Sequence, residues 1–238
     1  MADSPTGGSP TYDLTDGVAV ITLDDGKANA ISADVLTGLH AALDRAESEA
    51  RAVMIAGRPG RFSAGFDLAT MTGSAEGMRE LVSSGARFMM RLYGFGLPTV
   101  AACTGHALAA GALTLLCCDS RIGARGDFKI GLNEVAIGMP LPIFAVELAR
   151  DRLAPKRLVA ATVQAQIHSP EEAVAIGFLD ELAAGDELLA TALAEASRLG
   201  ELKTGAYART KQAVRGQTID HILASLDEDM AGTDTPGA

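Results

Sequence analysis

Segments patterned like β-strands alternate with segments patterned like helices through the first half of the chain. Strand-like runs rich in apolar and β-branched residues occupy 17–25, 52–57 and 98–105, and helix-like runs occupy 32–51 and 75–95. Strands that are separated by helices pair in parallel through crossover connections. The alternation therefore predicts an α/β fold and argues against an all-β or an α+β fold.

The chain reads as helical from about residue 142 onward. Apolar spacing predicts two helices within 141–164, broken near Pro155, and two more at 186–199 and 204–230. We expect three regions along the chain, namely a disordered leader at 1–10, an α/β core at 11–200, and a C-terminal helical region with a tail at 201–238.

A shorter helix in this part carries clear start and stop signals. Ser169 can cap its beginning, Pro170 takes its first position and Glu172 its third, and Gly177 should end it. Short strands are expected at 120–124, 127–130 and 178–182.

Charge and cysteine content exclude several classes of partner. A formal net charge of −10 and a pI near 4.8 argue against nucleic acid or an anionic membrane as the main partner. No apolar run reaches the roughly 18 residues of a membrane-spanning helix. Cys103, Cys117 and Cys118 have no metal-ligand spacing and do not suggest a disulfide framework. We therefore expect a protein of the reducing cytoplasm without a metal site.

Two segments rich in glycine and alanine each follow a predicted strand. The first, 62–68, lies in a loop expected over 57–68, and the second, 104–116, leads into a helix expected over 106–119. Small residues let backbone amides approach a bound group, and the start of a helix favours negative charge. Two such amides converging on one oxygen would form an oxyanion hole. Neither segment matches a nucleotide-binding fingerprint.

Glu134 is the one acidic residue in 128–140, a segment that is otherwise apolar or small. An ionised carboxylate in apolar surroundings is costly, so burial should raise the pKa of Glu134 and make it a better base. The alternative is a structural acid that pairs with Arg121 or accepts from backbone amides. Asp119 is likewise expected to anchor a loop or to pair with Arg121. The apolar neighbours expected to bury Glu134 are Ile130, Leu132, Val135 and Ile137.

Together and in this order, these segments resemble the crotonase (enoyl-CoA hydratase/isomerase) superfamily over roughly residues 11 to 230. The resemblance rests on DGKANAI, GRFSAGFDL, TGHALAAGALTLLCCDSRIGA, IGLNEVAIGMP and SPEEAVAIGFLDEL. It implies a ClpP-like ββα spiral core with a helical C-terminal trimerisation region. It also implies an acyl-CoA substrate, no separate cofactor, and a homotrimer or a hexamer built as a dimer of trimers.

The resemblance also assigns roles by position. The amides of Phe66 and Ala110 would form the oxyanion hole, although the family usually has glycine where Ala110 stands. Lys27 and Arg61 are candidates for contact with the CoA phosphates. His106, beside the second loop, is expected to be a core or rim residue. The other residues implied to bind the substrate are Ala28, Ala64, Gly65, Asp67, Leu68 and Asn133.

The number of carboxylates decides which reaction is expected. Hydratases of this superfamily use two glutamates, and the first of these positions is Leu113 here, whereas the second is Glu134. A single base suffices to move a double bond from C3–C4 to C2–C3, and IGLNE is similar to the corresponding segment of Δ3,Δ2-enoyl-CoA isomerases. The sequence thus favours an enoyl-CoA isomerase. An enoyl-CoA hydratase and a non-catalytic acyl-CoA-binding protein remain open.

Overall fold

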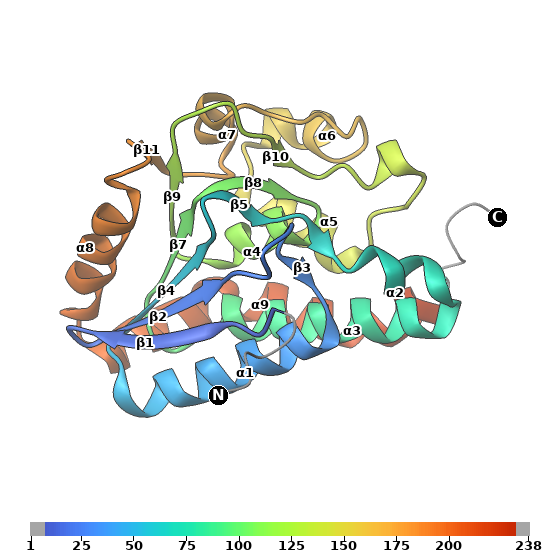
Figure 1. Cartoon of the computed structure of the whole chain (residues 1–238). Coiled ribbons are helices and arrows are strands. Elements are labelled where there is room, and N and C mark those ends of the chain that lie inside the picture. Colours follow the sequence, from blue (N-terminus) through green and yellow to red (C-terminus); the bar gives the residue numbers. More distant parts are fainter. Residues whose placement is uncertain (1–7, 232–238) are drawn as a thin grey trace, which may run out of the picture.

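The main element of the fold is a six-stranded sheet, seen in a computed structural model that describes residues 8–231 (Figure 1). Its strand order is β1-β2-β4-β7-β9-β11, and every neighbouring pair after the antiparallel β1–β2 hairpin is parallel. The parallel pairing confirms the predicted α/β fold. The strands are β1 (Thr11–Thr15), β2 (Val18–Leu23), β4 (Ala52–Gly57), β7 (Thr99–Cys103), β9 (Ser120–Ala124) and β11 (Glu181–Ala183).

Helices cover both faces of this sheet, which explains the continuous apolar run of β4. Val53 and Ile55 face a core shared with α1 (Ala33–Glu49), α3 (Ala75–Tyr93) and the C-terminal helix. Alternate residues of the same strand pack against α8 (Leu188–Gly200) on the other face (Figure 1). Because a strand buried on both faces has no polar side, the side chains of β4 are all apolar.

Two smaller sheets position the loops of interest. One has the order β10-β8-β5, and the other pairs β3 with β6, all in parallel. The strands are β3 (Ala30–Ile31), β5 (Gly60–Ser63), β6 (Gly65–Phe66), β8 (Gly105–Leu108) and β10 (Ile130–Gly131).

Three local predictions were wrong in their extent. The helix expected over 106–119 begins only at Ala110, because the residues before it pair as β8 between β5 and β10. The loop expected over 57–68 contains β5 and β6. The strand expected over 127–130 is β10, which spans Ile130–Gly131 and overlaps the predicted range only at Ile130.

The remaining helices agree with their start and stop signals where these exist. Ser32 caps α1 by accepting from the Val35 amide. Ser169 and Glu172 form a reciprocal capping box, and Gly177, with a φ of +106°, ends α7 as expected. The remaining elements are α2 (Leu68–Gly73), α4 (Ala110–Cys117), α5 (Ile143–Arg152), α6 (Leu158–Ala161), α7 (Pro170–Ile176), α9 (Thr204–Ala231), and the 3₁₀ turns η1 (Val135–Ile137) and η2 (Pro155–Arg157).

The predicted leader and tail fall largely outside the part of the chain that the structure describes. Residues 1–7 and 232–238 lie outside the described residues, so the disordered leader and frayed tail stay predictions there. Strand β1, which follows directly, was not predicted. It turns into β2 through Asp16 and Gly17, whose φ values of +51° and +80° suit a tight hairpin turn.

A buried ionic cluster attaches α9 to the sheet, and it corrects one predicted pair. Asp119 accepts from Lys211 at 2.6 Å, from Arg215 at 2.7 Å and from the Tyr207 hydroxyl at 2.8 Å. Arg121 does not pair with Asp119. Its guanidinium instead binds Asp180, the residue before β11.

Candidate active site

The first small-residue loop lies against the segment that contains Ala28. The Ala64 amide donates to the Ala28 carbonyl at 3.0 Å, and the Asp67 amide donates to the Ile31 carbonyl at 3.0 Å. Between these two bonds, Gly65 and Phe66 pair with β3. The residues predicted to contact CoA and the first predicted oxyanion donor therefore belong to one local structure.

The second loop ends at the start of a buried helix. Ala110 is the first residue of α4, so its amide has no carbonyl acceptor four residues earlier within the helix. The preceding Ala109 has a φ of +50° and a ψ of −126°, a conformation that favours glycine. All eight residues of α4 are buried, and a helix N-terminus in such surroundings favours negative charge.

The two loops are in contact through Gly65. A Cβ atom placed on Gly65, whose φ is +97°, would lie 3.2 Å from the Ala110 nitrogen and 2.9 Å from the Ala109 Cβ. Similarly, a Cβ on Gly111 would collide with the Ser63 carbonyl. Because only glycine fits at these two positions, the backbone of the first loop can approach the start of α4 closely.

Glu134 is attached to the same place by β10. Gly131 pairs with Leu108 of β8, and its carbonyl accepts from the Ala109 amide at 3.0 Å. Glu134 follows three residues later and precedes the 3₁₀ turn η1. Glu134 thus follows closely on the point where β10 pairs with the end of β8, just before α4 begins.

Burial raises the pKa of Glu134 to about 7. Among the described residues, its Oε2 atom is buried and has no hydrogen-bond partner, and the same holds for Oδ1 of Asn133. The predicted rise in pKa is confirmed, but its predicted cause is only half right. Ile130 and Leu132 are buried, whereas the side chains of Val135 and Ile137 are 44% and 54% exposed.

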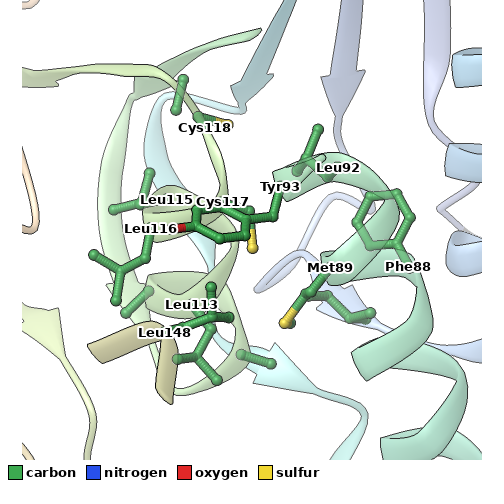
Figure 2. Close-up of a cluster of buried hydrophobic side chains, with 14 of the residues drawn as sticks. Phe88, Met89, Leu92, Tyr93, Leu113, Leu115, Leu116, Cys117, Cys118 and Leu148 are labelled. Carbon is green, nitrogen blue, oxygen red and sulfur yellow. The ribbon is translucent and has the colours of Figure 1, made fainter. Parts of the chain in front are cut away.

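No second carboxylate comes from α4. Leu113 stands where the resemblance placed the first glutamate of the hydratases. It is 1% exposed and packs in a cluster that includes Met89 of α3 and Leu148 of α5 (Figure 2). Of the structural alternatives for Glu134, an ion pair with Arg121 is wrong because Arg121 is held by Asp180. The backbone amide of Glu134 itself does hydrogen-bond the carboxylate and lowers its pKa, but by less than burial raises it. Within residues 8–231, no group of three or more His, Cys, Asp or Glu side chains could hold a metal ion.

Other predicted contacts are used locally or lie at the rim. The Asp67 carboxylate caps α2 by accepting from the amide and hydroxyl of Thr70. Leu68 is 63% exposed at the start of that helix. A Cβ on Gly85 of α3 would collide with the Phe66 ring, which therefore packs on α3.

The basic candidates come from three places, with His106 on β8, Arg61 on β5 and Lys27 in the turn between β2 and β3. His106 accepts from the Lys129 amide through Nδ1 and contacts Phe128 edge to face, as expected for a rim residue. Arg61 donates to the Gly60 carbonyl, and the Lys27 amide donates to Asp25. Neither of these bonds occupies the Lys27 ammonium group, which stays a candidate for phosphate contact.

Two surface pockets lie away from the candidate residues. A pocket of about 460 Å³ lies over α9 beside Tyr207 and Val214, and one of about 560 Å³ lies between α3 and the end of α9. None of the predicted site residues lines either pocket. No helix in the described part of the chain is long and apolar enough to span a membrane.

Comparison with known proteins identifies the family. The profile described as "Enoyl-CoA hydratase/isomerase" matches residues 13–231. The chain belongs to this family. A solved enoyl-CoA hydratase/isomerase family protein from Pseudomonas syringae is 42% identical, with a TM-score of 0.92 over 94% of this chain and 98% of that one. The crotonase fold implied by the sequence is thereby confirmed.

Relatives within the enoyl-CoA hydratase/isomerase family carry both activity names. An enoyl-CoA isomerase structure from Mycobacterium tuberculosis is 36% identical, with a TM-score of 0.90, covering 94% of this chain and 98% of that one. An enoyl-CoA hydratase structure from Mycobacterium marinum is 35% identical, with a TM-score of 0.91, covering 95% and 100%. The mouse mitochondrial enoyl-CoA delta isomerase 1 is 28% identical, covering 90% of this chain and 76% of its own length.

Proposed function

We propose that this enzyme shifts the double bond of a 3-enoyl-CoA to give the 2-enoyl-CoA. The observation that carries the proposal is a half-buried Glu134 with a raised pKa, together with an apolar Leu113 at the other carboxylate position on α4. Hydration needs groups that both activate water and protonate the α-carbon, whereas isomerisation needs one group that moves a proton. A single carboxylate suits the second reaction.

In the proposed mechanism, the thioester carbonyl accepts hydrogen bonds from the amides of Phe66 and Ala110. Glu134 removes a proton from C2, and the electron pair of that C–H bond delocalises into a dienolate held by the two amides. The same carboxyl then returns the proton to C4, which leaves the double bond between C2 and C3. Each oxyanion donor is worth roughly 3 kcal/mol, and these bonds strengthen as charge develops on oxygen.

The raised pKa of Glu134 supports this role. A base with a pKa of about 7 is ionised in half the molecules at neutral pH and is a stronger base than a solvated glutamate. Among residues 8–231, no group forms a hydrogen bond with the Oε2 atom, so its lone pairs are not engaged by the protein. The mitochondrial enoyl-CoA delta isomerase 1 among the relatives supports the same reaction.

Specific observations favour two other functions. The hydratase named among the relatives favours enoyl-CoA hydration, in which another carboxylate or a water network would replace the missing glutamate. The departures at Ala110 and Leu113 motivate a non-catalytic acyl-CoA-binding protein, because such a protein could bind the thioester without stabilising its enolate. The backbone conformation of Ala109 favours the same alternative.

Turnover of two substrates separates the three functions. Purified enzyme is incubated with 3-hexenoyl-CoA or with 2-hexenoyl-CoA, and the products are identified by mass spectrometry and NMR. We expect isomerisation by the wild type, a loss of about 10³-fold in Glu134→Gln, and no change in Glu195→Gln on the distant α8. Hydration that survives Glu134→Gln would contradict the mechanism, and tight binding without turnover would favour the binding protein.

Assembly and location stay predictions. We expect a homotrimer or a dimer of trimers, which light scattering of the purified protein would measure directly. The three cysteines are free and buried, in keeping with the reducing cytoplasm expected from the sequence.

A further inference from the structure

Asn29 is a buried polar residue that the proposed reaction does not use. It is 4% exposed and has a φ of +53°, in the left-handed region that asparagine tolerates better than most residues. Its Nδ2 donates to the carbonyls of Leu23 at 2.8 Å and of Arg61 and Phe62 at 3.1 Å each. One carboxamide thus holds the end of β2 and the middle of β5 together.

Asp25 holds Asn29 itself in this position. One carboxylate oxygen of Asp25 accepts from the amides of Lys27 and Asn29 at 2.7 and 2.9 Å, and the other accepts from the Ala30 amide at 3.2 Å. In return, the Asp25 amide donates to Oδ1 of Asn29 at 3.0 Å. Burial opposes ionisation, but these backbone donors lower the pKa of Asp25 below its usual value. These hydrogen bonds therefore hold the turn between β2 and β3 in one conformation.

Ser63 links Asn29 to the first small-residue loop through two hydrogen bonds. Its hydroxyl donates to the Asn29 carbonyl at 2.7 Å and accepts from the Gly65 amide at 3.2 Å, and the side chain is 1% exposed. Gly65 is the residue at which an added Cβ would lie 2.9 Å from the Ala109 Cβ and 3.2 Å from the Ala110 nitrogen. A continuous set of hydrogen bonds therefore runs from Asn29 to the contact between the two loops.

We propose that Asn29 and Ser63 are positioning residues that set the location of the Phe66 amide relative to the Ala110 amide. This inference rests on the proposed oxyanion hole. Phe66 follows Gly65 directly, so a shift of Gly65 moves the donor by a similar amount. Because a misplacement of about 1 Å can cost on the order of 10²-fold in rate, a hydroxyl that fixes this residue controls the chemical step.

The main test is Ser63→Ala, which removes one oxygen atom and with it the hydrogen bonds to the Asn29 carbonyl and the Gly65 amide. The matched control is Thr162→Val, which removes a buried hydroxyl that donates to the Leu158 carbonyl beside α6, away from these loops. We measure kcat and KM for 3-hexenoyl-CoA and the melting temperature of each variant. For Ser63→Ala we expect kcat to fall about 10- to 100-fold, with KM within about threefold of the wild type.

The carbonyl stretch of a bound thioester reports the hydrogen bonds directly. Hexanoyl-CoA labelled with ¹³C at the thioester carbon is bound to each protein, and its infrared band is compared with the band in water. We expect a shift to lower frequency in the wild type and in Thr162→Val, and a smaller shift in Ser63→Ala. A residue that only supports the fold would change the melting temperature but not this band.

Asn29→Gly gives a second, independent variant. Glycine keeps the left-handed backbone and removes the side chain, so a smaller carbonyl shift in this variant reports the lost bonds to Leu23, Arg61 and Phe62. A band and a kcat equal to wild type in both Ser63→Ala and Asn29→Gly would overturn the inference.

Failure of the proposed function gives a different result. If the wild type shifts the carbonyl band but does not isomerise 3-hexenoyl-CoA, the proposed reaction is wrong, and the band in the variants still decides the positioning role. If the wild type leaves the band as in water, the bound thioester meets no oxyanion hole and the positioning inference is overturned.

Discussion

At the scale of single residues, the protonation state of Glu134 sets the pH range in which this chain can work. Burial raises the pKa of Glu134 to about 7, so the base form is in the minority at pH 6 and dominates at pH 8. A proton-abstracting carboxylate acts only when ionised. The activity of the proposed isomerase should therefore follow the ionised fraction of this one group.

The first prediction concerns the pH dependence of kcat/KM for 3-hexenoyl-CoA. We expect it to rise about tenfold per pH unit below pH 7 and to level off above it, because ionisation of Glu134 produces the active form. Initial rates between pH 5.5 and 8.5 measure the profile, with Glu195→Gln as the control. A flat profile over this range would rule out Glu134 as the base.

The second prediction concerns the strain at Ala109. A non-glycine residue at φ +50° and ψ −126° costs on the order of 1–3 kcal/mol, partly offset by the greater chain entropy of glycine. We expect Ala109→Gly to raise the free energy of unfolding by about 1 kcal/mol in urea denaturation. Ala112→Gly, inside the same helix and without strain, should lower it by about 1 kcal/mol. Destabilisation by both would show that the loop is relaxed.

The residue scale also shows what a sequence can reveal about a site. Glu134 could be singled out because a lone acid in an apolar segment is unusual, and its raised pKa agrees with that reasoning. Asn29 and Ser63 gave no such signal. Their polar groups bind carbonyls of neighbouring segments, and those pairings exist only after β2, β3 and β5 have come together.

At the scale of secondary-structure elements, predictions succeeded where a local signal decides the structure. The capping box at Ser169 and the stop at Gly177 depend on residues next to each other in the chain. β8 was mistaken for helix because small apolar residues suit both structures, and its pairing with β5 and β10 decides the outcome. The hairpin turn at Asp16 and Gly17 is a local signal that could have revealed β1.

The third prediction concerns the end of α7. Gly177 has a φ of +106°, and an added Cβ would lie 2.8 Å from the Arg152 carbonyl oxygen. We expect Gly177→Ala to lower the free energy of unfolding by about 1–3 kcal/mol, because it combines backbone strain with a clash. Gly185→Ala is the control, since a Cβ there meets no atom within 4 Å. Equal unfolding midpoints in urea for the two variants would contradict this account.

At the scale of the whole molecule, long-range pairing fixes the C-terminal helix to the sheet. The alternation of strands and helices was enough to predict parallel pairing, because each crossover is local in sequence. It was not enough to find the partners of Asp119. Arg121 was the nearest cation in the chain, but Lys211 and Arg215 approach from α9, 92 and 96 residues away.

The fourth prediction follows from this cluster. Although burial alone would raise it, the charges of Lys211 and Arg215 hold the pKa of Asp119 below its usual value. Asp119→Asn leaves two buried cations without their counter-charge, so we expect a loss of about 3–5 kcal/mol in the free energy of unfolding. Urea denaturation at pH 7 measures it, with the exposed Asp127→Asn as the control. A loss below about 1 kcal/mol would show that the cluster is not needed for stability.

The distance in sequence between Asp119 and its cations also bears on biosynthesis. A ribosome adding about 5 to 20 residues per second needs roughly 5 to 20 s to make the 96 residues that separate Asp119 from Arg215. During that interval the nascent sheet has no cations of α9 to neutralise this carboxylate. The buried Asp119 carboxylate can therefore gain its native counter-charges only late in translation, once Lys211 and Arg215 have been added to the chain.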